Sequence, residues 1–233
     1  ASRCNNVAWN GNARKSRFAN MQVDVVRTVT VDNWSPAIGK DLPEGLEGLL
    51  EGGCVLFFPN LTFDFGAGNN DLISQRWADG KAKNISYRGD DHPLRGAQGN
   101  KEDLLRLKGV LAQYAAAAES LIKHLCPHYV PHLKKGFTSY RTASVEGRKS
   151  SWRKDDSRLH LDAFPSNPTG GKRLLRVFSN VNPNGGAVVL DWLRIAKIAR
   201  HNQIPVIGAA REGQRFDRTV DWTVQHDSHV ELS

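Results

Sequence analysis

One long amphipathic stretch, residues 102–125, constrains the fold of this chain more than any other part of its sequence. Its apolar residues recur at intervals of three and four, which is the period of a helix with one buried face. Four consecutive alanines, residues 115–118, add high helix propensity, and Pro127 marks the end of the pattern. The stretch therefore predicts one long helix.

The sequence on either side of this helix has a different character. After Lys134, runs with strand-like patterning are separated by Gly, Pro and Asn turns, which predicts a barrel or jelly roll. The expected strands there are residues 137–144, 158–164, 173–181 and 186–190, followed by a helix at 191–200. Before the long helix we expect a strand at 22–31, short helices at 43–51 and 71–77, a buried strand at 54–58 and an irregular surface segment at 83–99. Roughly the last twenty residues are polar and weakly patterned.

The composition fits one soluble domain. The chain has 233 residues, of which 39% are hydrophobic and 24% charged, values that are ordinary for a globular protein. No apolar run approaches the roughly 18 residues that a membrane-spanning helix needs. Three cysteines are scattered without C-x-x-C spacing, and no signal-peptide pattern begins the chain. We therefore expect a cytoplasmic protein, with residues 1–20 as a disordered extension.

Positive charge is concentrated in two places. The formal net charge is +8, and the first twenty residues supply half of it, because they contain four basic residues and no acidic one. Residues 135–158 form a second basic segment, in which seven Lys and Arg residues accompany three acidic ones. This segment either steers an anionic substrate or is a solvated basic loop.

The motif that points to chemistry is His160-Leu161-Asp162. Side chains of a strand alternate between its two faces, so His160 and Asp162 would project to the same side. Together with a distant histidine, these residue types form the iron site of non-haem oxygenases, which leaves open positions for a cosubstrate and dioxygen. A hydrogen-bonded His–Asp pair on an ordinary strand is the alternative.

A second set of histidines is a weaker candidate for a metal site. His124, His128 and His132 are four residues apart, but Pro127 and Pro131 interrupt the helix that would align them. We therefore expect these histidines to be solvated or at the edge of the core.

The sequence around the H-x-D motif closely resembles the Kdo hydroxylase family. The similarity is carried by RKSSWRKDDSRLHLDAFPSNPTGGKRLLRVFSNVNPNG at 148–185 and, upstream, by GGCVLFFPNLTF, DGKAKNISY and LCPHYVPHLKKGFTSYR. It extends over residues 21–185. The resemblance implies an α+β fold with a double-stranded β-helix (jelly-roll, cupin-like) core, an N-terminal α/β region and one long helix.

The resemblance also implies an active site that uses Fe(II) and 2-oxoglutarate. His160 and Asp162 would be two of three iron ligands. An anionic cosubstrate needs a basic partner, and arginine binds a carboxylate through two parallel hydrogen bonds. Arg158 and Arg176 are the candidates, with ordinary surface exposure as the alternative for each.

The reaction implied for the family is hydroxylation by O2 of Kdo, at C3, in the Kdo-lipid A of Gram-negative lipopolysaccharide. The expected partner is therefore this or a related anionic glycolipid, with peripheral contact at the inner membrane. No nucleic acid is expected.

The C-terminal part departs from the family pattern. Family members continue well past the NPNG turn at 182–185 and supply a distal iron histidine there. Neither His226 nor His229 matches that histidine, so the third ligand is not assigned. We expect residues 21–233 to form a single oxygenase-like domain that is incomplete at its C-terminal end, with weakened iron binding and activity reduced or lost.

A non-catalytic module that binds anionic glycans or nucleic acid is the alternative function. It would use the basic segment 135–158, in which Tyr140 and Trp152 could stack on sugar rings or bases. Aromatic residues are sparse between the charges, which is unfavourable for a single-strand binding platform.

Overall fold

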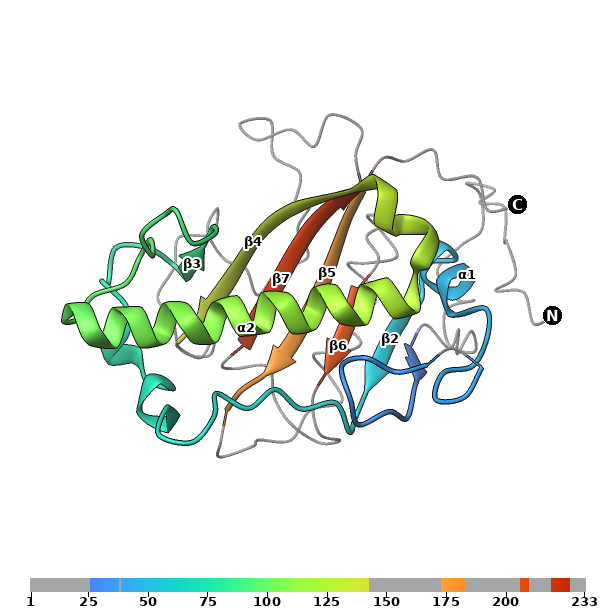
Figure 1. Cartoon of the computed structure of the whole chain (residues 1–233), viewed down its shortest axis with the longest axis horizontal. Coiled ribbons are helices and arrows are strands. Elements are labelled where there is room, and N and C mark those ends of the chain that lie inside the picture. Colours follow the sequence, from blue (N-terminus) through green and yellow to red (C-terminus); the bar gives the residue numbers. More distant parts are fainter. Residues whose placement is uncertain (1–25, 38, 143–172, 183–205, 210–218, 227–233) are drawn as a thin grey trace, which may run out of the picture.

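The computed structural model describes residues 26–37, 39–142, 173–182, 206–209 and 219–226. Within them, seven strands form one mixed sheet in the order β1-β2-β6-β5-β7-β4-β3 (Figure 1). The strands are β1 (Val26–Thr28), β2 (Val55–Phe58), β3 (Ile85–Tyr87), β4 (Leu133–Arg141), β5 (Arg173–Asn180), β6 (Val206–Ala209) and β7 (Thr219–His226). The helices are α1 (Leu46–Glu51) and α2 (Lys101–Leu125), with 3-10 turns η1 (Asn70–Leu72), η2 (Gln75–Trp77) and η3 (Pro127–His132).

The sheet has a parallel half and an antiparallel half. Strands β1, β2, β6 and β5 run parallel to one another. Strand β7 pairs antiparallel with both β5 and β4, and β4 pairs antiparallel with β3. Because β6 lies between β2 and β5, and β7 between β5 and β4, the last strands in the sequence occupy the middle of the sheet. The sheet is therefore continuous only when the C-terminal strands are in place.

Helix α2 crosses one face of the sheet (Figure 1) and contacts β3, β4 and β7. The side-chain oxygen of Asn100 accepts a hydrogen bond from the backbone N–H of Asp103 at 2.8 Å, which satisfies a donor that the first helical turn leaves unpaired. The helix ends before Pro127, so the helix predicted at 102–125 is confirmed. No helix among the described residues, α2 included, is long and apolar enough to span a bilayer.

The hydrophobic core lies between α2 and the sheet. The helix contributes Leu107, Val110, Leu111, Tyr114, Ala118, Leu121, Ile122 and Leu125, and the strands contribute Leu56, Phe58, Ile85, Tyr140, Leu175 and Val177. Two buried hydroxyl groups are satisfied by backbone carbonyls: Tyr114 donates to Val177 at 3.0 Å and Tyr140 donates to Leu72 at 3.2 Å. These bonds fix α2 and η1 to the same side of the sheet.

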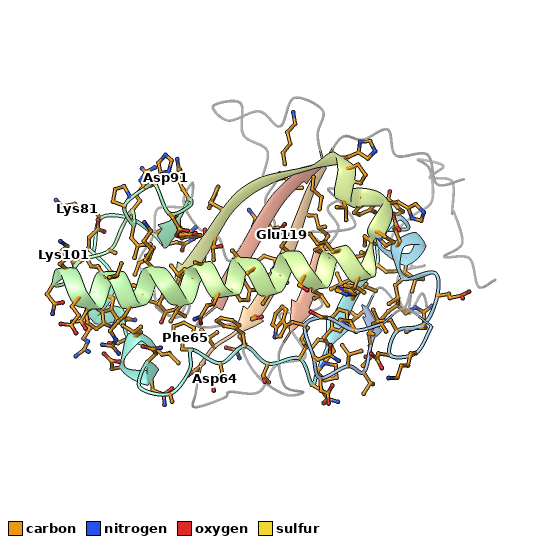
Figure 2. All side chains as sticks on the ribbon, viewed as in Figure 1. Asp64, Phe65, Lys81, Asp91, Lys101 and Glu119 are labelled. Atoms are coloured by element: carbon orange, nitrogen blue, oxygen red, sulfur yellow. The ribbon has the colours of Figure 1, made fainter. Side chains whose placement is uncertain are left out.

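Aromatic residues of the loop after β2 extend this core. Phe63 packs edge-on against Tyr114 with ring centroids 4.9 Å apart, and the fully buried Phe65 meets Tyr140 at 5.5 Å. Figure 2 shows Phe65 below α2 and the neighbouring Asp64 turned outward. The loop is therefore held by alternate aromatic side chains that enter the core.

One of the two short helices predicted before α2 is confirmed and the other is wrong. Helix α1 falls within the segment predicted at 43–51. The segment predicted as one helix at 71–77 instead forms η1 and η2. Ser74 separates them because it is extended and its side chain accepts a hydrogen bond from the backbone N–H of Arg76, which begins a new turn.

Strand predictions are confirmed where the apolar pattern is dense. Strands β2, β4 and β5 coincide closely with the expected 54–58, 137–144 and 173–181, although β4 begins four residues early. Strand β1 lies within the expected 22–31. β1 and β2 are rich in β-branched or aromatic residues, as strands that pack on a core require.

Three strands were not expected. Strand β3 lies in the segment predicted to be irregular, and β6 is only four residues long. Strand β7 falls in the C-terminal part that the sequence analysis describes as weakly patterned. Val220, Trp222 and Val224 alternate there with polar residues, which is the period-two signature of a strand. The strand was not predicted because the polar residues between these apolar ones make the segment polar on average.

Several predictions fall outside the described residues. These are the strands at 158–164 and 186–190, the helix at 191–200 and the extension at 1–20. They stay predictions.

The hydrogen bond between Tyr114 and Val177 should contribute measurably to stability. Tyr114→Phe removes the donor but keeps the ring, so we expect the free energy of unfolding in urea to fall by about 1 kcal/mol. Tyr87→Phe is the matched control, because its hydroxyl donates to Asp90 at a more exposed site; it should change stability by less than about 0.5 kcal/mol. Equal effects of the two substitutions would contradict this role for Tyr114.

Candidate active-site face of the sheet

Strand β5 presents two different faces. Leu175 and Val177 are fully buried in the core beneath α2. Because side chains alternate along a strand, Arg176 and Phe178 lie on the opposite side of the sheet, which we call the far face. Both are half-buried, and the guanidinium carbon of Arg176 lies 5.8 Å from the centre of the Phe178 ring. The far face therefore carries a cation near the middle of the sheet.

Strand β4 adds a second arginine to the far face. Tyr140 is fully buried on the α2 side, so its neighbours Ser139 and Arg141 lie on the far face. Arg141 is half-buried, and its Nε donates to the side-chain oxygen of Asn84 at 3.4 Å. This bond ties the guanidinium group to the residue that precedes β3.

Strand β7 separates the two arginines. Arg176 pairs with Thr223, and Arg141 pairs with Thr219. They therefore differ by two strand spacings across the sheet and by four residues along it, which places their backbones roughly 17 Å apart. An anionic ligand bound over β7 would lie between two long, positively charged side chains.

Over β2 and β5 the far face is shielded from water, as the α2 side is. By the same alternation Val55, Phe57 and Leu174 belong to the far face, and none is more than 9% exposed. This part of the sheet is therefore buried on both faces. Arg176 thus lies in surroundings where its attraction for an anion is stronger than at an open surface.

The described residues include only part of the predicted site. His160, Asp162 and Arg158 lie outside them, as does His229, while His226 is the last residue of β7. Within the described ranges, no three His, Cys, Asp or Glu side chains are grouped so that they could hold a metal ion. The predicted iron ligands therefore stay predictions, and Arg176 is the predicted site residue whose place in the fold is known.

Arg141 was not predicted as an individual candidate and belonged only to the basic segment 135–158. Tyr140 was considered as a residue that stacks on sugars or bases. That role for Tyr140 is wrong, because its ring is fully buried and its hydroxyl is bonded to the backbone. The alternation of side chains along FTSYR, residues 137–141, could have predicted the position of Arg141. Once Tyr140 is assigned to the core, Arg141 must lie on the other face.

The three regularly spaced histidines have separate environments. His124 Nδ1 lies 2.7 Å from the carbonyl of Ser120, and His128 Nδ1 lies 3.0 Å from a carboxylate oxygen of Glu47. The 3-10 turn η3 replaces the helix that would align them, and His132 is exposed. They lie at the edge of the core and on the surface, as expected.

A surface hollow of about 470 Å³ lies at the N-terminal end of α2. It is lined by Arg76, Trp77, Gln98, Gly99, Asn100 and Asp103. Its charges are paired internally, because Arg76 contacts Asp71 at 2.9 Å and Arg106 contacts both Asp71 at 2.8 Å and Asp103 at 2.9 Å. The hollow is therefore a poorer site for an anion than the far face.

Comparison with solved structures identifies the class of protein. The chain is similar to the Kdo hydroxylase KdoO, a non-haem Fe(II) α-ketoglutarate-dependent dioxygenase solved in complex with cobalt(II), with a TM-score of 0.70 and 26% sequence identity. The match covers 87% of this chain and 89% of that one. KdoO solved with α-ketoglutarate (2-oxoglutarate) and Fe(III), and solved in its apo form, gives TM-scores of 0.68 and 0.69 at the same identity and coverage.

Comparison with protein families agrees with the structures. The family model for 3-deoxy-D-manno-oct-2-ulosonic acid (Kdo) hydroxylase matches residues 33–192. The chain therefore belongs to the Kdo hydroxylase family, and the resemblance found in the sequence is confirmed. The matched range contains the H-x-D motif and all of β5. No curated protein matches the chain.

The ion pairs beside the hollow predict how the carboxyl group of Asp71 titrates in acid. The hydrogen bond from Arg106 holds the pKa of Asp71 below its usual value of 3.8. Because the folded-state pKa is depressed, the stabilisation is present above pH 3.8 and is lost as the pH falls through the folded-state pKa. In Arg106→Gln the pKa of Asp71 should rise toward 3.8, as measured by NMR titration of its carboxyl carbon. Arg95→Gln is the matched control, and an unchanged Asp71 pKa in Arg106→Gln would argue against this cause.

Proposed function

We propose that this chain is an Fe(II)- and 2-oxoglutarate-dependent hydroxylase of Kdo. The observation that carries the proposal is the family match over residues 33–192. Its support is the likeness to KdoO, which was solved with 2-oxoglutarate and Fe(III). The family match favours an enzyme over the non-catalytic binding module that the sequence left open.

The finer fold that we propose is a double-stranded β-helix, or jelly roll. In this arrangement the seven-stranded sheet is one of two sheets, and the reaction takes place on its far face. The burial of Val55, Phe57 and Leu174 supports a layer on that side, since α2 covers only the other. Mixed helices and strands are present in the described residues, which agrees with an α+β fold.

We assign His160 and Asp162 to the iron. An imidazole nitrogen and a carboxylate oxygen suit Fe(II), and a set of three protein ligands leaves positions for the cosubstrate and O2. The third ligand is unassigned, because neither His226 nor His229 is equated with the distal histidine of the family. Bound iron supplies the redox chemistry by which O2 hydroxylates a C–H bond, while the protein side chains hold and orient the reactants.

Arg176 is the residue that we assign to a carboxylate of 2-oxoglutarate. Its guanidinium group is half-buried on the far face, where two parallel hydrogen bonds to a carboxylate gain strength from the shielding. Arg141 lies on the same face across β7 and is suited to a second anionic group, a role for which Arg158 is the other candidate. The cosubstrate would thus be oriented at one end by fixed cationic groups.

The substrate that we propose is Kdo within Kdo-lipid A, hydroxylated at C3. Kdo is an acid, so its carboxylate suits a face that carries arginines. The lipid part would bring the chain into peripheral contact with the cytoplasmic side of the inner membrane. The net charge of +8 favours such contact, because that surface is anionic.

Release of succinate from 2-oxoglutarate is the direct test of the function. The purified chain should release succinate only when Fe(II), O2 and Kdo-lipid A are all present, and a chelator should abolish the release. His160→Ala and Asp162→Ala should each lower the rate at least about 100-fold, because each removes a proposed iron ligand. A folded wild-type protein that releases no succinate, or an Asp162→Ala protein that keeps full activity, would refute the assignment.

The role of Arg176 has a separate prediction. Arg176→Met should raise the KM for 2-oxoglutarate at least about tenfold, because the charge-assisted pair is lost. Arg176→Lys should recover part of this loss, since an ammonium group keeps the charge but not the two-pronged geometry. The control is Arg95→Gln at an exposed position. Equal KM values in Arg176→Met and the control would overturn the assignment.

A further inference from the structure

An arginine and an aromatic side chain contact each other at the β3–β4 end of the sheet. Strand β4 has an irregularity in its register with β7 between Lys135 and Thr138, and Phe137 within it is 39% exposed. The guanidinium carbon of Arg88 lies 5.6 Å from the centre of the Phe137 ring. Arg88 directly follows β3, whose last residue pairs with Thr138, so the strand register itself brings Arg88 beside Phe137.

The pair belongs to the same face as Arg176. Thr138 is fully buried on the α2 side and its partner Tyr87 packs against the core, so Arg88, the residue after Tyr87, lies on the far face. The contact between Arg88 and the Phe137 ring places that ring on the far face as well. Thr223 of β7 pairs with Arg176 on one side, and on the other it lies opposite the irregularity that contains Phe137. Because β5 and β4 are two strand spacings apart, the backbones of Arg176 and Phe137 are roughly 10 Å from each other.

Among the described residues, no carboxylate is paired with Arg88. Arg88 is exposed, and its guanidinium group contacts the Phe137 ring. Arg76 and Arg106, in contrast, are paired with Asp71. A guanidinium group that rests on an aromatic face keeps its N–H groups available and its orientation restricted, which suits it to bind a carboxylate or phosphate.

We propose that Arg88 and Phe137 bind a second anionic group of the glycolipid substrate, beside the Kdo unit that is hydroxylated. This inference rests on the proposed function. Because β3 is three strand spacings from β5, the backbones of Arg176 and Arg88 are roughly 14 Å apart across the same face, and the reacting sugar fits between 2-oxoglutarate on Arg176 and an anion on Arg88. Arg88 binds the group through paired hydrogen bonds, and Phe137 fixes the guanidinium group. The group is a carboxylate of a neighbouring acidic sugar or a phosphate of the lipid A part.

The consequence is specificity for a larger, multiply charged substrate. Binding energy gained at a remote anionic group holds the reacting sugar in place. Loss of this contact should therefore weaken binding of the glycolipid without weakening binding of 2-oxoglutarate.

The experiment compares Arg88→Gln with Arg95→Gln. Arg95 is also exposed and lies close to Arg88 in the fold, because its backbone forms an isolated β-bridge with Ser86. Calorimetric binding of Kdo-lipid A in detergent micelles is measured for both variants, together with the KM values for glycolipid and 2-oxoglutarate. Arg88→Gln should weaken glycolipid binding and raise its KM about tenfold or more, and the KM for 2-oxoglutarate should stay within twofold of wild type. Phe137→Leu should give a smaller loss in the same direction.

A second arm uses Kdo-lipid A from which the phosphates have been removed. If the Arg88→Gln defect disappears with this substrate, the bound group is a phosphate; if it persists, the group is a sugar carboxylate. Equal glycolipid binding by Arg88→Gln and Arg95→Gln overturns the proposal, because the loss of any one positive charge would then explain the change in binding. The binding measurement does not need turnover. If the wild-type protein is inactive, the proposed function is refuted, and the binding comparison still decides whether Arg88 binds the glycolipid.

Discussion

The packing of α2 against one face of the sheet is the constraint on which the rest of the structure depends. The helix has one apolar stripe, and its burial fixes which side of every strand belongs to the core. The bond from Tyr114 to the carbonyl of Val177 anchors the helix to β5 in the middle of the sheet. Once this side is set, the alternation of strands leaves Arg141 of β4 and Arg176 of β5 on the far face. The placement of a candidate site is thus a consequence of where the helix is buried.

The order of strands gives the C-terminal part of the chain a structural role in that face. Strand β5 carries Arg176, and both of its neighbours, β6 and β7, come later in the sequence. β7 also lies between the two arginines of the far face and opposite Phe137. Parallel and long-range pairings of this kind form only after large loops have closed. The face on which we place the reaction therefore depends on residues beyond the H-x-D motif.

The sequence was sufficient for elements whose local pattern matches their burial. The long helix follows from its periodicity, its end from Pro127, and β2 from a continuous apolar run. Strand β7 was missed because its polar residues hide a regular alternation, and η1 and η2 because a serine cap interrupts a helical composition. Arg176 could be named from a family resemblance, but the position of Arg141 and the contact between Arg88 and Phe137 depend on strand register, which no local pattern specifies.

A crystal structure of the protein with Co(II) and 2-oxoglutarate tests the central claim most directly, namely that the far face of the sheet is the active-site face. We expect 2-oxoglutarate on the side of the sheet opposite α2, with one of its carboxylates within hydrogen-bonding distance of the Arg176 guanidinium group and the metal held by His160 and Asp162. A cosubstrate bound on the α2 side, or in the hollow beside Trp77, with Arg176 out of contact, would contradict the account.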